Sequence, residues 1–448
     1  MSAPAAERGQ WSSQIGFILA AAGSAVGLGN IWRFPYSAGE SGGGAFVLLY
    51  LVCVLALGLP VMLLEISLGR ATQKNPVGAI RAVRPNGPWK LLGYLAIATG
   101  LGILSFYAVI AGQVVAACVD FTQRIFTGRE LFHSFGPTAS IFFFALFTLL
   151  TVLVVAGGVQ RGIERWAKIL MPMLLVMMLA IIVRGLLLPG AGEGVAWLLR
   201  PDPSKITFEV VLEAMSQAFF SLSLGMGAML TYGSYLSKKQ NVLHCGGWVV
   251  FFDTLIAILA GLMIFPAVFA LGQEPNAGPD LIFRVLPAVF GEMVGGTAVG
   301  AVFFFLLAVA ALTSTVSLLE VVAAYFIDER GWSRTATVWA AGAVTVLVGL
   351  PSALSWVSAD KEFFGWMDLL WVNLSLPFGA LMLCLFATFV WGLRKASDEI
   401  TSSSPEFRWM APTWRFFVRV VCPIFIALIL LTRFVPVDRL LRLLGGGT

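Results

Sequence analysis

Two stretches of the chain place glycine and polar residues inside otherwise apolar sequence. The first is GSAVGLGN, from Gly23 to Asn30, and the second is FFSLSLGMG, from Phe219 to Gly227. Glycine weakens a helix, and unwound backbone at membrane depth is tolerated only where it lines a cavity or is buried in protein. The freed carbonyl oxygens suit a small hard cation such as sodium, and the freed N–H groups suit a carboxylate. The two breaks therefore predict a site for a zwitterion together with sodium.

Close helix packing is the competing explanation for the glycines. Gly23 and Gly27 have the spacing at which small residues let two membrane helices approach each other. Packing alone leaves the neighbouring Asn30, Ser221 and Ser223 unexplained, so we favour the binding interpretation.

Three carboxylates also lie within apolar sequence, where each costs about 2.5–3.5 kcal/mol at mid-membrane on insertion scales. They are Glu65, Asp253 and Glu320. For Asp253 we expect a direct sodium ligand or a charge that offsets the ion, and the alternative is a neutral, hydrogen-bonded carboxyl. For Glu65 and Glu320 a structural role is favoured, as acceptors for N–H groups freed at the breaks.

A further set of hydroxyl groups lies in AALTSTVSLLE, which ends at Glu320. Ala310, Thr313 and Ser314 share one helical face by the i, i+3, i+4 rule. Their oxygens suit completion of a sodium shell with carbonyls from the first break. Serine and threonine in membrane helices also bond to their own helix, so this pattern alone is a weak signal.

The elements that must hold these residues are membrane helices. Of the 448 residues, 58% are hydrophobic and 12% are charged, whereas soluble domains carry about 25% charged residues. We therefore expect a single all-α integral membrane domain over residues 1–448. A span needs roughly 20 apolar residues, and this criterion predicts eleven transmembrane helices, at about 12–36, 43–70, 89–124, 139–157, 164–187, 208–235, 244–271, 296–327, 333–351, 365–393 and 411–434.

The breaks fall in the first and sixth predicted helices, so each opens a unit of five. Broken helices at matching places in two halves indicate a secondary transporter with inverted repeats, here about 12–187 and 208–393, with an extra helix at about 411–434. The distribution of Lys and Arg predicts a cytoplasmic N-terminus and an external C-terminus in the cell membrane. It also accounts for the net charge of +5 without nucleic-acid binding. The chain lacks a Walker A motif, so uphill transport would use an ion gradient.

The motif GSAVGLGNIWRFPY, followed by SGGGAF, resembles the signature of the neurotransmitter:sodium symporter family. QAFFSLSLGMG and LTSTVSLLE match in order and spacing, and the resemblance covers roughly residues 8–434. Eleven helices with short outer loops look like the prokaryotic branch, whose members include amino-acid transporters. The resemblance implies alternating access, with helices 1 and 6 unwound at mid-membrane.

The resemblance also implies two sodium sites. The first maps onto Ala25, Asn30, Ser221 and Asp253, and the second onto Gly23, Val26, Ala310, Thr313 and Ser314. Position 253 is more familiar as asparagine in this family, so Asp253 departs from the best-known pattern. Chloride-dependent members use the anion to offset sodium charge, and a fixed carboxylate can do the same. We therefore expect two sodium ions and no chloride requirement.

The same resemblance places the substrate carboxylate against Gly29 and the Tyr107 hydroxyl, and the substrate amino group near carbonyls of the two breaks. Gly27 stands where amine transporters of the family carry an aspartate, which favours an amino acid. Because the pocket is apolar and methionine is deformable, we expect a bulky apolar or aromatic side chain. The implied substrate-binding residues are Ser24, Ala25, Gly29, Ile103, Tyr107, Phe220, Ser221, Ser223, Gly225, Met226, Ser314 and Leu318.

Gates are implied on both sides of this site. Arg33 with Asp368 matches the outer gate, and Arg8 with Asp328 and nearby Tyr235 matches the cytoplasmic one. We expect such pairs to be partly solvated and worth about 1 kcal/mol each. Ordinary interfacial charges are the alternative for both arginines.

The fifth predicted helix carries Gly162 and Pro172, separated by nine residues. Proline removes a helix hydrogen bond and glycine weakens the helix. The spacing resembles a place where related bacterial transporters unwind this helix and wet the second sodium site from inside. Glycine and proline are also common in membrane helices, which is the alternative.

Together these features predict a sodium-coupled symporter that imports a hydrophobic or aromatic L-amino acid across the lipid bilayer. Uptake of another small zwitterion, such as an osmolyte or a γ-amino acid, stays open, as does a sensor that binds an amino acid without moving it. An enzyme is disfavoured because the sequence shows no nucleophile–base pair or metal-ligand cluster. The sequence leaves the oligomeric state open.

Overall fold

The computed structural model describes residues 11, 13–128, 136–158, 165–358 and 361–432. This part of the chain is helical and contains no strand. Within it, eight helices are long and apolar enough to cross a membrane, or up to ten if each of two bent pairs is one span. The predicted all-α membrane fold is confirmed, while the count of eleven spans stays a prediction.

The helices follow the predicted segments closely in the described ranges. Single π-helical turns at Val54–Gly58, Leu369–Ser375 and Phe417–Val421 continue α3 into α4, α16 into α17 and α19 into α20. The α-helices are α1 (Gln14–Ala25), α2 (Phe34–Glu40), α3 (Gly44–Cys53), α4 (Leu59–Thr72), α5 (Pro76–Val83), α6 (Lys90–Thr127), α7 (Pro137–Ala156), α8 (Arg165–Leu186), α9 (Ala191–Leu199), α10 (Phe208–Ser221), α11 (Ala228–Gly233), α12 (Val242–Ala270), α13 (Leu281–Gly291), α14 (Gly296–Arg330), α15 (Arg334–Trp356), α16 (Glu362–Asp368), α17 (Leu376–Phe386), α18 (Leu393–Thr401), α19 (Phe407–Phe416) and α20 (Cys422–Thr432).

The first predicted helix is broken where the sequence places glycine. α1 ends at Ala25, and Val26 has an extended backbone with φ −76° and ψ 101°. The chain resumes as a π-helical turn over Gly29–Arg33 that runs into α2. The two parts are bent by 43° from each other, so the predicted break in this helix is confirmed.

The sixth predicted helix is broken more widely, between α10 and α11. Three residues of this connection have a left-handed backbone: Ser223 (φ 56°), Gly225 (φ 80°) and Gly227 (φ 73°). Glycine adopts this conformation without steric cost, whereas a serine there is uncommon. A side chain on Gly225 would clash with the carbonyl of Leu376, because α17 packs its backbone against the break. The sequence of the break thus permits both the turn and the close approach.

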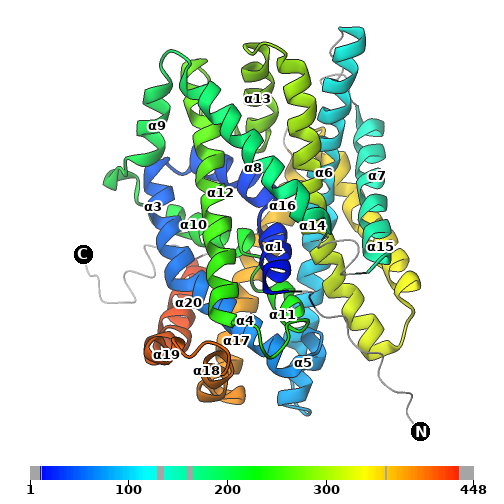
Figure 1. The fold of residues 1–448 in the computed structure, drawn as a ribbon, viewed down its shortest axis with the longest axis vertical. Coiled ribbons are helices and arrows are strands. Elements are labelled where there is room, and N and C mark those ends of the chain that lie inside the picture. Colours follow the sequence, from blue (N-terminus) through cyan, green and yellow to red (C-terminus); the bar gives the residue numbers. More distant parts are fainter. Residues whose placement is uncertain (1–10, 12, 129–135, 159–164, 359–360, 433–448) are drawn as a thin grey trace.

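Helices distant in sequence meet around the two breaks. α1 contacts both α12 and α14, and α10 contacts α3 and α17. In Figure 1, α12 stands beside α1, while α6, α7, α14 and α15 pack together on the other side of the molecule. The breaks therefore lie inside the bundle, where protein side chains can bond the freed backbone groups.

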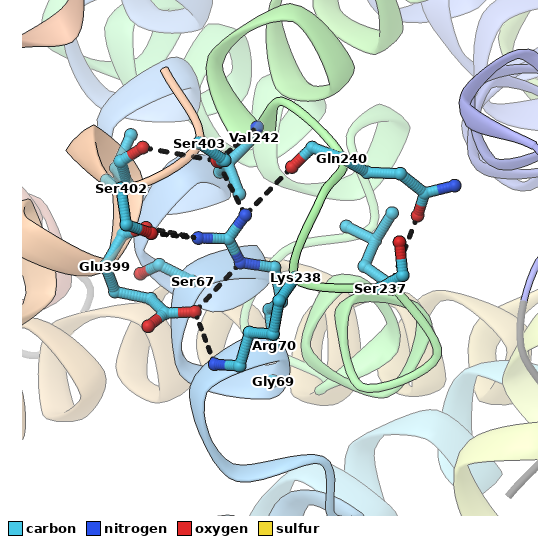
Figure 2. A network of polar contacts seen from close by, with 12 residues as sticks. Ser67, Gly69, Arg70, Ser237, Lys238, Gln240, Val242, Glu399, Ser402 and Ser403 are labelled. Carbon is cyan, nitrogen blue, oxygen red and sulfur yellow. Dashed lines mark hydrogen bonds and ion pairs between the residues drawn. The ribbon is translucent and has the colours of Figure 1, made fainter. Parts of the chain in front are cut away.

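A polar cluster ties the end of α4 to two distant segments (Figure 2). The Arg70 side chain is fully buried, and it donates to the carbonyl of Gln240 at 2.8 Å and to Ser403 Oγ at 2.6 Å. Its Nε donates to Glu399 Oε1 at 2.9 Å, and Lys238 Nζ lies 2.7 Å from the same carboxylate oxygen. Because a buried charge without partners is costly, these bonds hold α18 and the α11–α12 loop against α4.

Candidate functional site

Side chains from α6 and α10 bond backbone groups freed at the first break. Tyr107 Oη accepts from the N–H of Leu28 at 2.9 Å, and Gln217 Nε2 donates to the carbonyl of Gly29 at 2.8 Å. Buried backbone groups in native proteins almost always have such partners. Since the Tyr107 hydroxyl is the acceptor in its bond, it keeps its own proton to donate to another oxygen.

The hydroxyl groups of α14 face the end of α1. Thr313 Oγ1 donates to the carbonyl of Gly23 at 2.5 Å and lies 2.7 Å from the carbonyl of Ala310 in its own helix. Ser314 Oγ donates to the carbonyl of Ser24 at 3.0 Å. The structure thus gathers, around the end of α1 where Val26 follows, the residues predicted for the second sodium site: Gly23, Ala310, Thr313 and Ser314.

A buried carboxylate from α12 joins the two breaks. Asp253 Oδ1 accepts from Asn30 Nδ2 of the first break at 2.7 Å, and Oδ2 accepts from Ser221 Oγ at the end of α10 at 3.0 Å. Tyr50 Oη of α3 donates to Oδ2 at 3.1 Å. These three donors carry no charge, so an ionised carboxylate here would need a cation to offset it, while a neutral, hydrogen-bonded carboxyl stays the alternative.

The side chains that meet at Asp253 carry the oxygen atoms that hard cations prefer. Asp253, Asn30 and Ser221 supply carboxylate, amide and hydroxyl oxygens, and Ala25 ends the helix beside them. No group of three or more His, Cys, Asp or Glu residues that could hold a metal ion occurs in the described ranges. That these oxygens hold a sodium ion stays a prediction.

A small cavity of about 20 Å³ lies between the two breaks, and ten of the twelve predicted substrate-binding residues line it. A cavity of this size has room for about one water, so an amino acid enters only when side chains such as Phe220 and Met226 move. Two predicted residues lie elsewhere, because Ser221 turns to Asp253 and Gly225 lines a neighbouring cavity. The ten lining residues are Ser24, Ala25, Gly29, Ile103, Tyr107, Phe220, Ser223, Met226, Ser314 and Leu318.

Glu65 of α4 bonds the backbone of the second break. Its Oε1 accepts from the N–H of Gly225 at 2.7 Å, and Oε2 lies 3.3 Å from the N–H of Leu230 at the start of α11. The predicted role of Glu65 as an acceptor for freed N–H groups is confirmed. A fully buried carboxylate in this position also places negative charge at a helix N-terminus, which the helix dipole favours.

Glu320 does not have that role, and the prediction for it was wrong. It accepts from Tyr235 Oη at 2.8 Å and forms an ion pair with Arg334 at the start of α15. Glu320 lies nearly two turns beyond Ser314 along α14, so it meets the charges near the α14–α15 connection rather than either break.

Of the residues predicted for the cytoplasmic gate, Tyr235 bonds this ion pair and Asp328 bonds Asn75. Asn75 Nδ2 donates to Asp328 Oδ2 at 3.0 Å, and Tyr235 bonds Glu320. Arg8 and Gly162 lie outside the described residues. Pro172 lies within α8, which continues through it.

Arg33 lies between the cavity and α16. Its Nη2 is 3.3 Å from Asp368 Oδ2, and its Nη1 is 3.1 Å from Glu213 Oε1. Nη1 also donates to Gln217 Oε1 at 2.9 Å, and the guanidinium lies 5.3 Å from the Phe220 ring centroid. The arginine side chain is only 1% exposed, so the expectation of a partly solvated pair was wrong for Arg33. Its three polar partners explain how the charge is buried.

Three functional residues escaped the sequence analysis: Tyr50, Glu213 and Gln217. Glu213 and Gln217 are spaced i, i+4 on α10 and so share one helical face. The spacing could therefore have predicted that Glu213 and Gln217 contact the same partner. Tyr50 had a weaker signal, since a hydroxyl within an apolar stretch needs a bonding partner but the sequence does not name it.

Two membrane helices are broken inside the bundle, residues of both breaks line one small cavity, and a buried carboxylate bonds both breaks. These features define a secondary transporter built on discontinuous helices.

Comparison with known proteins extends this assignment. A sequence model of the "Sodium:neurotransmitter symporter family" matches residues 8–127 and 113–441. An uncharacterized sodium-dependent transporter of Bacillus subtilis is 39% identical over 436 residues, covering 94% of this chain and 97% of its own. Another, of Haemophilus influenzae, is 34% identical, covering 95% and 98%. The crystal structure of MhsT in complex with L-phenylalanine superposes with a TM-score of 0.90 at 43% identity, covering 95% of this chain and 99% of that one.

The chain belongs to the sodium:neurotransmitter symporter family. It is therefore a sodium-dependent transporter, a multi-pass membrane protein and not an enzyme. The predicted family and transport class are confirmed.

Proposed function

We propose that the protein is a symporter that imports a hydrophobic or aromatic L-amino acid together with two sodium ions. The observation that carries the proposal is one cavity that combines the Tyr107 hydroxyl with the apolar side chains of Ile103, Phe220 and Met226. A hydroxyl that donates to a carboxylate and a wall that accepts an apolar side chain fit the two ends of such a substrate. The L-phenylalanine in the similar MhsT structure supports the same class.

The substrate carboxylate would accept from Tyr107 Oη and lie against Gly29. Its amino group would donate to carbonyls near Ser24, Ala25 and Phe220. Ala25, Asn30, Ser221 and Asp253 would hold the first sodium ion next to that carboxylate. Sodium and substrate would then strengthen each other's binding to the same degree, as thermodynamic linkage requires.

Gly27 supports an amino acid over an amine. A side chain there would clash with Ser314 Oγ and lie 2.7 Å from Tyr107 Oη. An aspartate for an amine ligand therefore has no space at this position. The need for chloride is a separate question. Asp253 would supply a fixed negative charge near the first sodium ion, so we propose that transport needs no chloride.

Alternating access would move α1 between two arrangements. Sodium at Gly23, Val26, Ala310, Thr313 and Ser314 would hold α1 against α14, and its loss to the cytoplasm would release α1. Arg33 with Asp368 would close the outer side over Phe220, and Arg8, Asp328 and Tyr235 the inner side. We place the N-terminus in the cytoplasm and the C-terminus outside, with the two repeats at about 12–187 and 208–393 in a cell-membrane protein.

Accumulation in proteoliposomes tests the proposal. An inward sodium gradient should drive concentrative uptake of labelled leucine, phenylalanine or tryptophan, and potassium in place of sodium should abolish it. Tyr107→Phe should lose uptake, whereas Tyr94→Phe, at a 38% exposed tyrosine of the same helix, should not. Uptake of a γ-amino acid or osmolyte in preference to these would identify the other zwitterion class. Sodium-dependent binding without accumulation would identify a sensor.

A further inference from the structure

An apolar groove opens on the outside of the bundle between the start of α6 and α17. Pro88, Trp89, Leu91, Leu92 and Leu95 form one wall, and Phe378 and Met382 form the other. Its volume is about 470 Å³, far more than the 20 Å³ of the substrate cavity. The Leu91 side chain is 60% exposed and Phe378 is 44% exposed, so the groove faces the surroundings of the bundle.

The groove lies where α6 enters its apolar stretch. Lys90 is the first residue of α6, between the lining residues Trp89 and Leu91, and the next charged residue of the helix is Asp120. Tryptophan and lysine are typical anchors at the boundary between hydrocarbon and headgroups. The Trp89 ring also packs on Phe386 near the end of α17, with ring centroids 5.5 Å apart. The groove therefore runs from the headgroup level into the hydrocarbon.

The two chain segments that wall the groove carry charge of one sign. The sequence from Ile66 to Val119 contains no acidic residue, and neither does the sequence from Leu369 to Ser397. Arg84 and Lys90 are exposed, and no ion pair to either occurs in the described ranges. Both chain segments that wall the groove thus carry only positive charge.

We propose that this groove binds an anionic phospholipid of the surrounding bilayer. One acyl chain lies between α6 and α17, and the phosphate group meets Lys90 and Arg84. The apolar wall packs against any acyl chain alike, since lipid tails are as apolar as the side chains of the wall. The two basic residues therefore supply the selection for net negative charge. A zwitterionic phospholipid offers the same chains without net charge, so it binds more weakly.

The groove also leads toward the second break. Leu92 lines both the groove and the inner cavity that Glu65, Gly225 and Gly227 line. An acyl chain held against Leu92 is thus separated by one side chain from the cavity at the second break.

Photocrosslinking in nanodiscs tests the site directly. The full chain is placed in phosphatidylcholine nanodiscs with a trace of diazirine-labelled phosphatidylglycerol or diazirine-labelled phosphatidylcholine, and labelled peptides are mapped by mass spectrometry. We expect phosphatidylglycerol to label 88–95 and 378–382 in excess over phosphatidylcholine. Lys90→Gln and Arg84→Gln should each lower that excess about fivefold, the factor for about 1 kcal/mol per basic residue at an anionic surface.

Lys239→Gln is the matched control, because it removes an exposed positive charge from another loop and should leave the labelling unchanged. Equal labelling of the groove by both lipids would overturn the proposal. So would labelling no stronger than that of Leu153 or Leu347, which are exposed on α7 and α15. Since the readout is lipid labelling, failure here leaves the proposed transport function standing.

Discussion

Alanine at Gly27 is the smallest change that tests how tightly the first break is held. A Cβ at this position would overlap Ser314 Oγ and lie 2.7 Å from Tyr107 Oη. Each of these oxygens bonds the backbone of the break, Tyr107 to Leu28 at 2.9 Å and Ser314 to Ser24 at 3.0 Å. The added methyl group must therefore displace two side chains that position the site.

The size of the effect follows from these contacts. Overpacking a close-packed interior costs about 1–3 kcal/mol, and each neutral hydrogen bond lost costs about 1 kcal/mol. Moving one or both side chains to relieve the overlap therefore costs about 2–4 kcal/mol in total. If the cost falls on the bound state, substrate affinity drops roughly 30- to 1,000-fold.

Sodium-dependent binding of the amino acid identified by uptake provides the assay, with purified Gly27→Ala compared against the wild type. Gly247→Ala is the control, since a Cβ on Gly247 in α12 meets nothing within 4 Å. Adding Ser314→Ala to Gly27→Ala removes one of the two overlaps. Because Ser314→Ala alone also removes a predicted site residue, the comparison is made in its background. Gly27→Ala should cost less affinity there than in the wild type, and the cycle of single and double variants measures this coupling.

Unchanged affinity in Gly27→Ala would refute this account of the site. It would mean that Tyr107 and Ser314 can retreat without loss, so the bonds they make to the break would not position the substrate. If Gly27→Ala cost the same affinity with and without Ser314→Ala, the cost would be assigned to Tyr107 alone.

Five further predictions concern sodium and chloride, the second break and the outer gate. Asp253→Asn keeps the shape of the group but removes its charge. At about 4 Å and an effective dielectric of about 20 that charge is worth about 4 kcal/mol. Half-maximal sodium should therefore rise by two to three orders of magnitude in a sodium titration, and a rise below tenfold would contradict a direct role. Replacing chloride by gluconate should leave wild-type uptake unchanged. Glu65→Gln leaves one buried N–H without its acceptor, at about 1–3 kcal/mol, and thermal unfolding should show a lower midpoint. Arg33→Lys cannot form the planar fork, so bound substrate should dissociate faster, and an unaltered off-rate would exclude a gate there. Thr313→Val should raise the sodium requirement while the preference among amino acids stays the same.

The breaks could be predicted from the sequence because their causes are local. Gly23, Gly27 and Gly225 weaken or turn a helix wherever they stand, and apolar flanks fix the depth of the break in the membrane. Asp253 and Glu65 could be singled out for a similar reason, since a carboxylate in apolar sequence needs a partner. For Glu65 the type of partner also followed, because the break supplies N–H groups that lack one.

The contacts between helices could not be predicted in the same way. The bond from Tyr50 to Asp253 depends on how α3 is rotated against α12. The spacing of residues along a single helix does not determine that rotation. Glu213 is placed on Arg33 by the packing of α10 against the turn that follows the first break. Glu320 was assigned to a break because it is a carboxylate within apolar sequence. Its position along α14 instead brings it to Arg334.

The two predicted sodium sites differ in what they connect, and this difference separates their functions. Asp253 bonds Asn30 of the first break and Ser221 of the second. A cation at this carboxylate would therefore fix both broken helices around the substrate, and its binding must depend on which substrate is present. Thr313 Oγ1 bonds the carbonyl of Gly23 in α1 and that of Ala310 in its own helix. A cation there holds α1 to α14 whatever the substrate is, so changes at Thr313 should alter the conformational equilibrium and changes at Asp253 should alter coupling to the substrate.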